Sequence, residues 1–501
     1  MLQPVDVSFA SLNMPTLYPM LIAISGALLI LCMDLIKSGL NKSMYVMITV
    51  LFLALDLGAV LGFVGVLDSI GSVKGFFDVM LIDGIAVIAQ IIMLVASMFF
   101  ILLALTNQRF NEYRYAEYFA LFLFMISGLQ FMVSTDNLIL VFVGLETSSL
   151  ALYPLIAMHN KKNSFEAATK YFTMGALAAG FYAFGAMILY AVTGTVEISE
   201  MASVIGTAGI DVSTTIFIIV ATVFLLSAFA FKLGLVPFHT WTPDVYQGST
   251  SALAGFMSIV PKLAAFVVAI RLFEFLKSTD VFWIEMMLYV IVVLTMTMSN
   301  IWALVQKDVK RMLGYSSISH AGFVMSAVLI GSTQSNSALF IYWTLFSIAN
   351  LGAFAMLWMT HEKVHDHESD DAFEKFSGMI KTSPFTAVMM GLFMLSLAGI
   401  PPFALFWGKM YMIASAVAVD TKPYLVLALI MALNSGLAAY YYVKLIVYMF
   451  MKEPVNGNYT VNSSNILKTV IGTAAVFTIA SVVAVSPLME FVTTLVESSG
   501  Y

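Results

Sequence analysis

The sequence predicts an all-α, polytopic membrane protein with about fourteen transmembrane helices. Apolar residues make up 61% of the 501 residues and charged residues only 10%, whereas a soluble domain carries about 25% charged residues. Because so few charges cannot cover a water-exposed surface of this size, hydrocarbon must surround most of the chain. The apolar runs are continuous and lack an alternation of period two, which favours helices over a transmembrane β-barrel.

About fourteen apolar runs are long enough to cross a bilayer, which takes about 20 residues of helix. In chain order these runs are 16–36, 44–66, 80–105, 118–133, 138–158, 168–192, 216–247, 251–276, 281–305, 312–330, 338–359, 385–419, 424–450 and 466–485. No A-x-A-type cleavage site follows the first run, so we expect it to remain as an uncleaved anchor.

The basic residues predict the orientation of the chain. An even number of spans places both termini on one face. The connections on the opposite face hold Lys37, Lys42, Arg109, Arg114, Lys161, Lys162, Lys307, Lys310, Arg311, Lys363, Lys375, Lys381, Lys452 and Lys468. The connections on the terminal face hold only Lys74, Arg271, Lys277 and Lys422. The positive-inside rule therefore predicts a multi-pass protein of the bacterial inner membrane with both termini on the periplasmic side.

Two of the runs, 216–247 and 385–419, are unusually long and contain helix breakers. Their central segments read FKLGLVPFHTWTPDVYQG (231–248) and LAGIPPFALFWGK (397–409), each with a Pro-Phe pair followed by Trp. Proline removes a backbone donor and frees a carbonyl group, which hydrocarbon does not tolerate unless protein or water faces it. Paired interruptions in corresponding positions indicate inverted repeats with an ion path at mid-membrane; two simple proline kinks are the alternative.

Four ionisable residues lie within otherwise apolar spans: Glu146, Lys232, Lys262 and Lys409. Each would cost about 2.5–3.5 kcal/mol at a helix centre if it were charged and unpaired. They must therefore be paired, hydrated or neutral. Lysine loses its proton readily when buried, so a buried lysine is suited to relay protons. The alternative is that these residues form ion pairs that hold the helices together.

Five further polar residues lie in or near the spans. Lys170 either reaches Glu146 or extends to the surface. His239, just after the first break, is a candidate relay or hydrogen-bond partner. His320 follows several serines, so relaying and helix packing are both open. Asp34 lies near a helix end beside Lys37, where a surface pair is expected, and Asp56 lies deeper, with no role assigned.

Other features exclude some classes of function. A single cysteine, Cys32, excludes an intrachain disulfide and an iron–sulfur cluster. No basic tract indicates nucleic-acid binding. The segment 361–365 matches the H-E-x-x-H zinc-protease motif, and His367, Asp366, Asp370 and Asp371 could add a ligand. However, it lies in a short charged connection without a domain for a substrate cleft, so we expect a solvated cytoplasmic loop and no metal site.

Three segments carry a resemblance to a known family. They are FKLGLVPFHTWTPDVYQGSTSALAGFMSIVPKLAAF (231–266), DVKRMLGYSSISHAGF (308–323) and LSLAGIPPFALFWGK (395–409). They resemble, in the same order, the antiporter-like membrane subunits of NADH–quinone oxidoreductase (complex I), and the resemblance extends from the third span onward. TPDVYQG and Lys409 resemble the N-type subunits. The L- and M-types and the multisubunit antiporters usually read LPDAH at the first place, and the M-type usually carries glutamate at the second. The chain also lacks the long lateral helix of the L-type.

The resemblance implies an architecture of two inverted five-helix repeats, helices 4–8 and 9–13, with helices 7 and 12 broken. The corresponding regions are 1–116 for helices 1–3, 117–276 and 277–450 for the two repeats, and 451–501 for helix 14 and the C-terminus. The resemblance further implies a Glu146–Lys232 pair, a central Lys262, and Lys409 toward the outer half-channel.

The same resemblance implies proton translocation coupled to quinone reduction in other subunits. NADH, FMN, iron–sulfur clusters and quinone are then expected on partner chains, and no cofactor on this one. The expected partners are the lipid bilayer and the A, H, J, K, L and M types of membrane-arm subunit. Two alternatives stay open: a cation/proton antiporter subunit, and the homologous subunit of a membrane hydrogenase or ferredoxin-driven complex.

Overall fold

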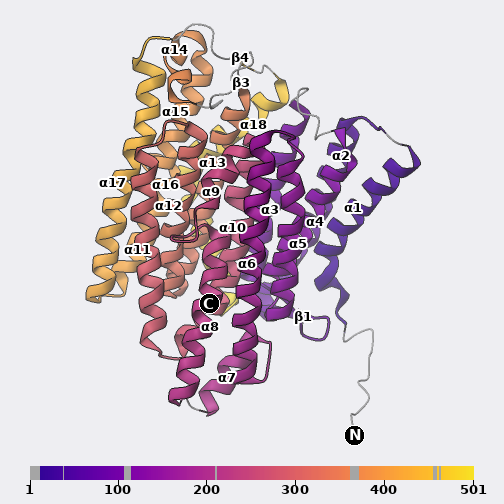
Figure 1. The fold of residues 1–501 in the computed structure, drawn as a ribbon, viewed down its shortest axis with the longest axis vertical. Coiled ribbons are helices and arrows are strands. Elements are labelled where there is room, and N and C mark those ends of the chain that lie inside the picture. The colour runs from indigo at the N-terminus through magenta and orange to yellow at the C-terminus, as the bar shows by residue number, and fades with distance from the viewer. Residues whose placement is uncertain are drawn as a thin grey trace.

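The computed structural model describes residues 12–37, 39–106, 114–208, 211–361, 372–454, 460–461 and 464–500 as a bundle of helices. α1 and α2 lie at one edge and α17 at the opposite edge (Figure 1). The α-helices are α1 Tyr18–Ile36, α2 Lys42–Ile70, α3 Gly84–Leu102, α4 Ala116–Val133, α5 Leu138–Ala157, α6 Lys162–Thr193, α7 Ile198–Ala208, α8 Val212–Leu233, α9 Trp241–Gly248, α10 Ser251–Ser278, α11 Phe282–Leu304, α12 Val309–Ile330, α13 Thr333–Met359, α14 Met379–Thr382, α15 Pro384–Ala398, α16 Ala404–Ala418, α17 Lys422–Met451 and α18 Asn465–Ser498.

The remaining elements are short. The 3-10 turns are Met14–Leu17, Leu103–Thr106 and Phe373–Phe376, and the strands are β1 Ser72–Gly75, β2 Met80–Asp83, β3 Thr360–His361 and β4 Thr460–Val461. β1 pairs antiparallel with β2, Ser72 opposite Asp83, and β3 pairs antiparallel with β4, Thr360 opposite Val461.

The predicted all-α membrane fold is confirmed. Among the described residues, thirteen helices are long and apolar enough to cross a membrane, and α15 and α16 are shorter apolar helices. α15 and α16 together occupy the expected run 385–419, while α8 and α9 divide the run 216–247. α7 was not anticipated, because its 11 residues are too few to form a span.

Both interrupted helices end in the same way. α8 is capped by Gly234 with φ 72°, and α15 by Gly399 with φ 73°. This left-handed conformation favours glycine because it has no Cβ. Cis peptide bonds follow at Val236–Pro237 and Pro401–Pro402, after which α9 and α16 begin. Each break therefore leaves the carbonyl end of a half-helix inside the bundle.

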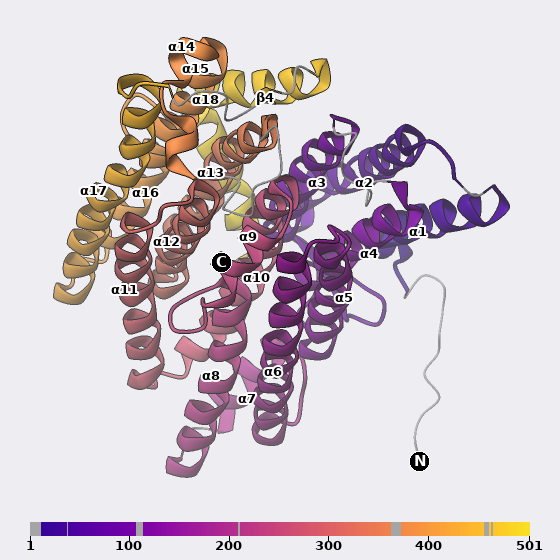
Figure 2. The ribbon, with the colours of Figure 1, turned by 45° about the horizontal axis from the view of Figure 1, so that its top comes forward.

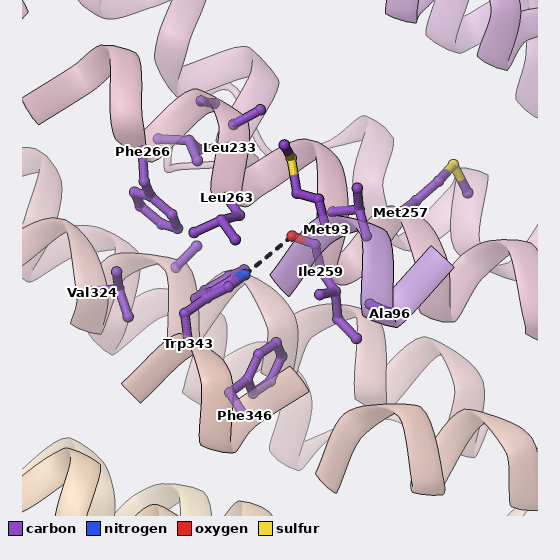
Figure 3. Packing of buried hydrophobic residues seen from close by; sticks show 14 of the residues in the cluster. Met93, Ala96, Leu233, Met257, Ile259, Leu263, Phe266, Val324, Trp343 and Phe346 are labelled. Carbon is purple, nitrogen blue, oxygen red and sulfur yellow. Dashed lines mark hydrogen bonds between the residues drawn. The ribbon is translucent and has the colours of Figure 1, made fainter. Parts of the chain in front are cut away.

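α10 forms the centre of the bundle, and every residue from 251 to 273 is buried. It packs against α3, α4, α8, α12 and α13, and it lies between α3 and α12 in Figure 2. The Nε1–H of Trp343 on α13 donates to the Ile259 carbonyl over 3.1 Å. Figure 3 shows this bond among apolar side chains such as Leu263 and Phe266. A closely packed apolar core thus surrounds the helix that carries Lys262.

The β1–β2 hairpin brings the two ends of the described chain to one face. The Phe76 N–H donates to the Leu12 carbonyl over 2.8 Å, and the Ile85 N–H donates to Ser499 Oγ over 3.0 Å. Termini on the same side are what an even number of spans requires. Arg109 and Lys363 of the charge asymmetry lie outside the described residues, as do 362–371 of the H-E-x-x-H segment.

Three of the basic residues that the sequence placed in connections, Arg271, Lys310 and Lys375, are buried in the fold. Arg271 belongs to α10 and is 2% exposed. Its Nη2 donates to both carboxylate oxygens of Asp83 over 2.8 Å, and its Nη1 donates to the carbonyls of Val133 and Thr135 over 2.8 and 2.7 Å. Arg271 is therefore not a solvated loop charge. Its partners are more than a hundred residues away in sequence, so no local pattern indicated the pairing.

We predict that the lysine asymmetry faces the cytoplasm. In a chain whose only cysteine is replaced by Cys32→Ser, cysteines would be introduced at two exposed sites, Lys161 and Lys422. An impermeant maleimide should label Lys422→Cys in spheroplasts and Lys161→Cys only after lysis. Labelling of Lys161→Cys in intact spheroplasts would reverse the proposed orientation.

We also predict that the Arg271–Asp83 pair is essential for stability. Asp83→Asn should destabilise the fold by about 3–5 kcal/mol, because it leaves a buried guanidinium without its counter-ion. The control is Lys381→Gln, which breaks a pair whose side chains are 55% and 84% exposed and should cost at most about 1 kcal/mol. Thermal unfolding of the purified protein in detergent measures both. Equal effects would contradict the prediction.

Candidate functional site

Three lysines are buried inside the helix bundle. Lys232 on α8, Lys262 on α10 and Lys409 on α16 are 3%, 1% and 5% exposed. Within the part of the chain that the structure describes, none of them forms an ion pair with a carboxylate within 4.0 Å. Each donates instead to neutral hydroxyl or carbonyl oxygens. Such partners satisfy an ammonium group, yet leave no unpaired carboxylate behind when the lysine loses its proton.

Lys232 lies in the last turn of α8, two residues before the Gly234 cap. Its Nζ donates to Ser149 Oγ over 2.9 Å and to Ser148 Oγ over 3.4 Å, both on α5. The negative end of the α8 dipole favours a cation at this position. The first break therefore builds a binding place for an ammonium group.

Glu146 lies on α5, less than one turn before the Ser149 hydroxyl that binds Lys232. It is half-buried, and its Oε1 has no hydrogen-bond partner among the described residues. The direct Glu146–Lys232 pair that the resemblance implied is not formed in this structure. The two groups still interact electrostatically.

A small cavity adjoins Lys232, with a volume of about 10 Å³. Its walls are formed by Leu145, Ser149, Gly175, Ala178, Ala228, Phe231 and Lys232. This volume is close to the space that one water molecule needs. A Cβ on Gly175 would lie 2.1 Å from the Tyr153 hydroxyl. Glycine at this position therefore leaves room for the phenol beside the wall of this cavity.

Lys170 is explained by a different set of contacts. Its Nζ lies 2.7 Å from Glu166 Oε1 and 3.1 Å from Asp244 Oδ2. The other carboxylate oxygen of Asp244 accepts from Arg311 Nη1 over 2.8 Å. Lys170 and Arg311 thus fasten α9, the second half of the broken helix, to α6 and α12. Of the two alternatives from the sequence, Lys170 does not pair with Glu146; its side chain is 44% exposed and extends to a partly exposed pair of carboxylates.

His239 lies in the segment between α8 and α9 and is 6% exposed. Its ring stacks on Trp302 of α11 with centroids 4.6 Å apart and an interplanar angle of 11°. Nδ1 has no side-chain or backbone hydrogen-bond partner among the described residues. The ring is therefore held in place by stacking while one nitrogen stays available for a proton.

Lys262, on α10, contacts α12 one turn before His320. Lys262 Nζ donates to Ser317 Oγ over 2.9 Å and to the Ser317 carbonyl over 3.1 Å. His320 lies one turn further on, where its Nδ1 and Nε2 contact the hydroxyls of Tyr342 over 2.6 Å and Tyr442 over 2.9 Å. α12 therefore carries the lysine contact and the histidine on neighbouring turns.

Tyr342 and Tyr442 were missed by the sequence analysis. Tyr442 on α17 also bonds Ser316 Oγ, so one hydroxyl joins α12 to α17 at two points. Only the run of three tyrosines at 440–442 inside an apolar helix could have suggested Tyr442. Tyr342, on α13, has no such signal. Because a phenol hydroxyl both donates and accepts, each tyrosine can extend a hydrogen-bonded chain through His320.

Lys409 binds at the second break. Its Nζ donates to the Ala398 carbonyl over 2.7 Å and lies 3.4 Å from the Leu397 carbonyl, both in the last turn of α15. A Cβ on Gly399 would lie 2.7 Å from Lys409 Cδ. Its neighbour Gly408 packs against Tyr342, whose Cα would lie 3.1 Å from a Cβ at residue 408. Lys409, like Lys232, thus lies beside a helix break, but it donates to the carbonyl end of the broken helix, whereas Lys232 donates to serine hydroxyls of α5.

No group of three or more His, Cys, Asp or Glu residues that could hold a metal ion occurs among the described residues. The polar side chains that the structure does bring together are three buried lysines, two histidines, serines and tyrosines. This set can bind, exchange and orient protons.

The chain matches a family model described as the transmembrane region of NADH:quinone oxidoreductase and Mrp antiporters, over residues 135–438. It is 63% identical to NADH-quinone oxidoreductase subunit N of Sulfurimonas denitrificans, with 100% of both chains covered. Its structure matches a chain of respiratory complex I from Thermus thermophilus at 29% identity and a TM-score of 0.78, covering 94% of this chain and 98% of the other. It also shares its fold with a chain of the Mrp complex from Dietzia sp. at 19% identity and a TM-score of 0.81, with 97% of both covered.

Proposed function

Because the chain belongs to the NADH:quinone oxidoreductase/Mrp antiporter transmembrane family, we propose that Lys232, Lys262 and Lys409 carry protons through it. The chain is a multi-pass membrane-arm subunit of NADH–quinone oxidoreductase, a proton-translocating complex in which it assembles with other antiporter-like subunits. The redox groups of that complex, NADH, FMN, iron–sulfur clusters and quinone, are proposed to reside on partner chains.

The alternatives are weaker for this chain. The antiporter complex shares the fold, so fold alone does not separate an antiporter subunit from a quinone-reductase subunit. Full-length identity of 63% to an N subunit, together with the TPDVYQG segment and Lys409, supports the quinone-reductase assignment over the antiporter. A subunit of a membrane hydrogenase or ferredoxin-driven complex would differ in its partner chains.

The observation that carries the proposal is the bonding of the three buried ammonium groups to neutral oxygens. Lysines that only held helices together would face carboxylates, as Lys170 does. Here the ammonium groups donate hydrogen bonds to neutral oxygens. Lys232 donates to a pair of serine hydroxyls, Lys262 to the hydroxyl and carbonyl of one serine, and Lys409 to two carbonyls at a helix end. A proton can leave such a group at a moderate electrostatic cost.

The proposed path begins at Glu146 and ends at Lys409. A change in charge near the quinone site alters the electrostatic field at Glu146. This change in turn lowers or raises the proton affinity of Lys232. The proton passes to Lys262 by way of water, then along α12 through His320. Tyr342, which contacts both His320 and the helix of Lys409, completes the link. His239 is proposed as an auxiliary site at the first break.

Two architectural proposals accompany this path. The identical glycine caps of α8 and α15 support two inverted repeats, 117–276 and 277–450, between the N-terminal region 1–116 and the C-terminal region 451–501. The lysine asymmetry supports termini on the periplasmic side, so Lys409 would release protons outward.

We predict that Lys232→Ala assembles but lowers proton pumping and quinone reduction together by at least about tenfold, in keeping with the weight of a positioned proton-transfer group. Lys232→Arg should be similarly impaired, because arginine keeps its proton in proteins. Activity and pumping are measured in membranes and normalised to assembled complex.

Lys170→Arg is the matched control. Lys170 binds two carboxylates, and arginine can bind both, so this variant should keep near wild-type pumping. Near wild-type pumping in Lys232→Arg would instead show that Lys232 only holds helices together.

We further predict that Tyr442→Phe slows pumping several-fold while leaving assembly intact, because the ring is kept and only the hydroxyl between Ser316 and His320 is lost. The control is Tyr440→Phe on the same helix, whose side chain is 65% exposed and should be neutral. Equal pumping rates in the two variants would remove Tyr442 from the path.

A further inference from the structure

A second buried acid lies apart from the lysine row, on the packed face of α2. Most of α2 faces outward, but Leu53, Asp56 and Val60 are each 0% exposed and form one stripe at helical spacing. Asp56 lies fourteen residues from either end of the helix. A carboxyl group thus occupies the middle of an otherwise apolar seam.

The partners of Asp56 are amides, and no ion pair joins it to a basic residue in the described part of the chain. Gln130 Nε2 on α4 donates to both oxygens of Asp56, over 2.9 and 3.0 Å. The same nitrogen lies 3.2 Å from Gln90 Oε1 on α3. Gln90 Nε2 then donates to Ser134 Oγ over 3.0 Å. All four side chains are at most 1% exposed.

One buried atom of this cluster, Gln130 Oε1, lacks a hydrogen-bond donor among the described residues, and a proton on Asp56 could provide one. A carboxyl group buried without a cation is far more stable with its proton bound, and a protonated carboxyl must donate. Rotating the Gln130 amide presents Oε1 to Asp56 as the acceptor.

The rest of the cluster can reverse in the same way. If the Gln90 amide also rotates, its Nε2 donates to Gln130 Oε1, and the Ser134 hydroxyl donates to Gln90 Oε1. The chain of four groups therefore has two arrangements, one in which Asp56 accepts and one in which it donates. Such a chain serves both charge states of the acid.

We propose that Asp56 is a proton-binding site separate from the Glu146–Lys409 path, and that Gln130 and Gln90 reverse their hydrogen bonds when the proton binds or leaves. Ser134 caps the end of α4, and its carbonyl accepts from Leu81 of the hairpin over 3.0 Å. The cluster thus runs from the middle of α2 toward the hairpin at the face that holds both termini.

The cluster also borders the proton path. α3, which carries Gln90, packs against both α2 and α10, the helix of Lys262. The charge on Asp56 is therefore placed to influence the packing beside the central lysine.

The test is infrared spectroscopy of the assembled complex, which reports the carbonyl stretch of protonated carboxyl groups and its shift in D2O. Asp56→Asn should remove one such band, and Asp34→Asn should leave it in place, because Asp34 lies near the end of α1 beside the Tyr45 hydroxyl. Gln130→Leu should keep the band but move it to higher frequency, since the carboxyl loses its hydrogen-bond partner.

Three outcomes decide the proposal. Loss of the band in Asp56→Asn, or its shift in Gln130→Leu if the first variant does not assemble, supports it. An unchanged carboxyl region in both variants overturns it, because Asp56 would then be ionised. A band that is present in choline chloride and disappears in sodium chloride also overturns it, because the site would bind a cation instead.

Discussion

The structure depends on one constraint: an ammonium group removed from water must find oxygen atoms within the protein. The three buried lysines meet it in two ways. Lys232 and Lys262 donate to serine oxygens on neighbouring helices, Ser148 and Ser149 on α5 and Ser317 on α12. A continuous helix uses its carbonyl groups internally, whereas a half-helix that ends inside the bundle offers them to a cation. Lys409 uses such an end, because its Nζ donates to the Ala398 carbonyl in the last turn of α15. The second break thus supplies a ligand for a buried ammonium group.

Rigidity around these groups comes from helices that do not bind protons. α10 is buried on all sides, and Trp343 fixes it to α13 through the Ile259 carbonyl. Arg271, on the same helix, anchors the β1–β2 hairpin through Asp83. These contacts hold the helix of Lys262 against its neighbours from both its middle and its end.

Two kinds of charged contact occur in this chain, and their surroundings separate them. Lys170, Asp244 and Arg311 form a partly exposed network of carboxylates and cations, in which solvent screens the charges and each pair contributes little. The buried lysines have neutral partners. Asp56 is the acidic counterpart of this second kind, since amides bind it. When a buried group with neutral partners gains or loses a proton, the local electrostatic field changes by a full charge, because no nearby charge compensates for it.

The sequence by itself determined the membrane fold, the two breaks and the three lysines. Hydrophobicity, proline and isolated charges in apolar runs are local properties, and local physics limits what hydrocarbon tolerates. The partners of those charges were decided only by the tertiary structure. Tyr442 reaches His320 across 122 positions, and Arg271 reaches Asp83 across 188. No local pattern specifies which helix faces lie together, because that choice depends on how all the side chains pack at once.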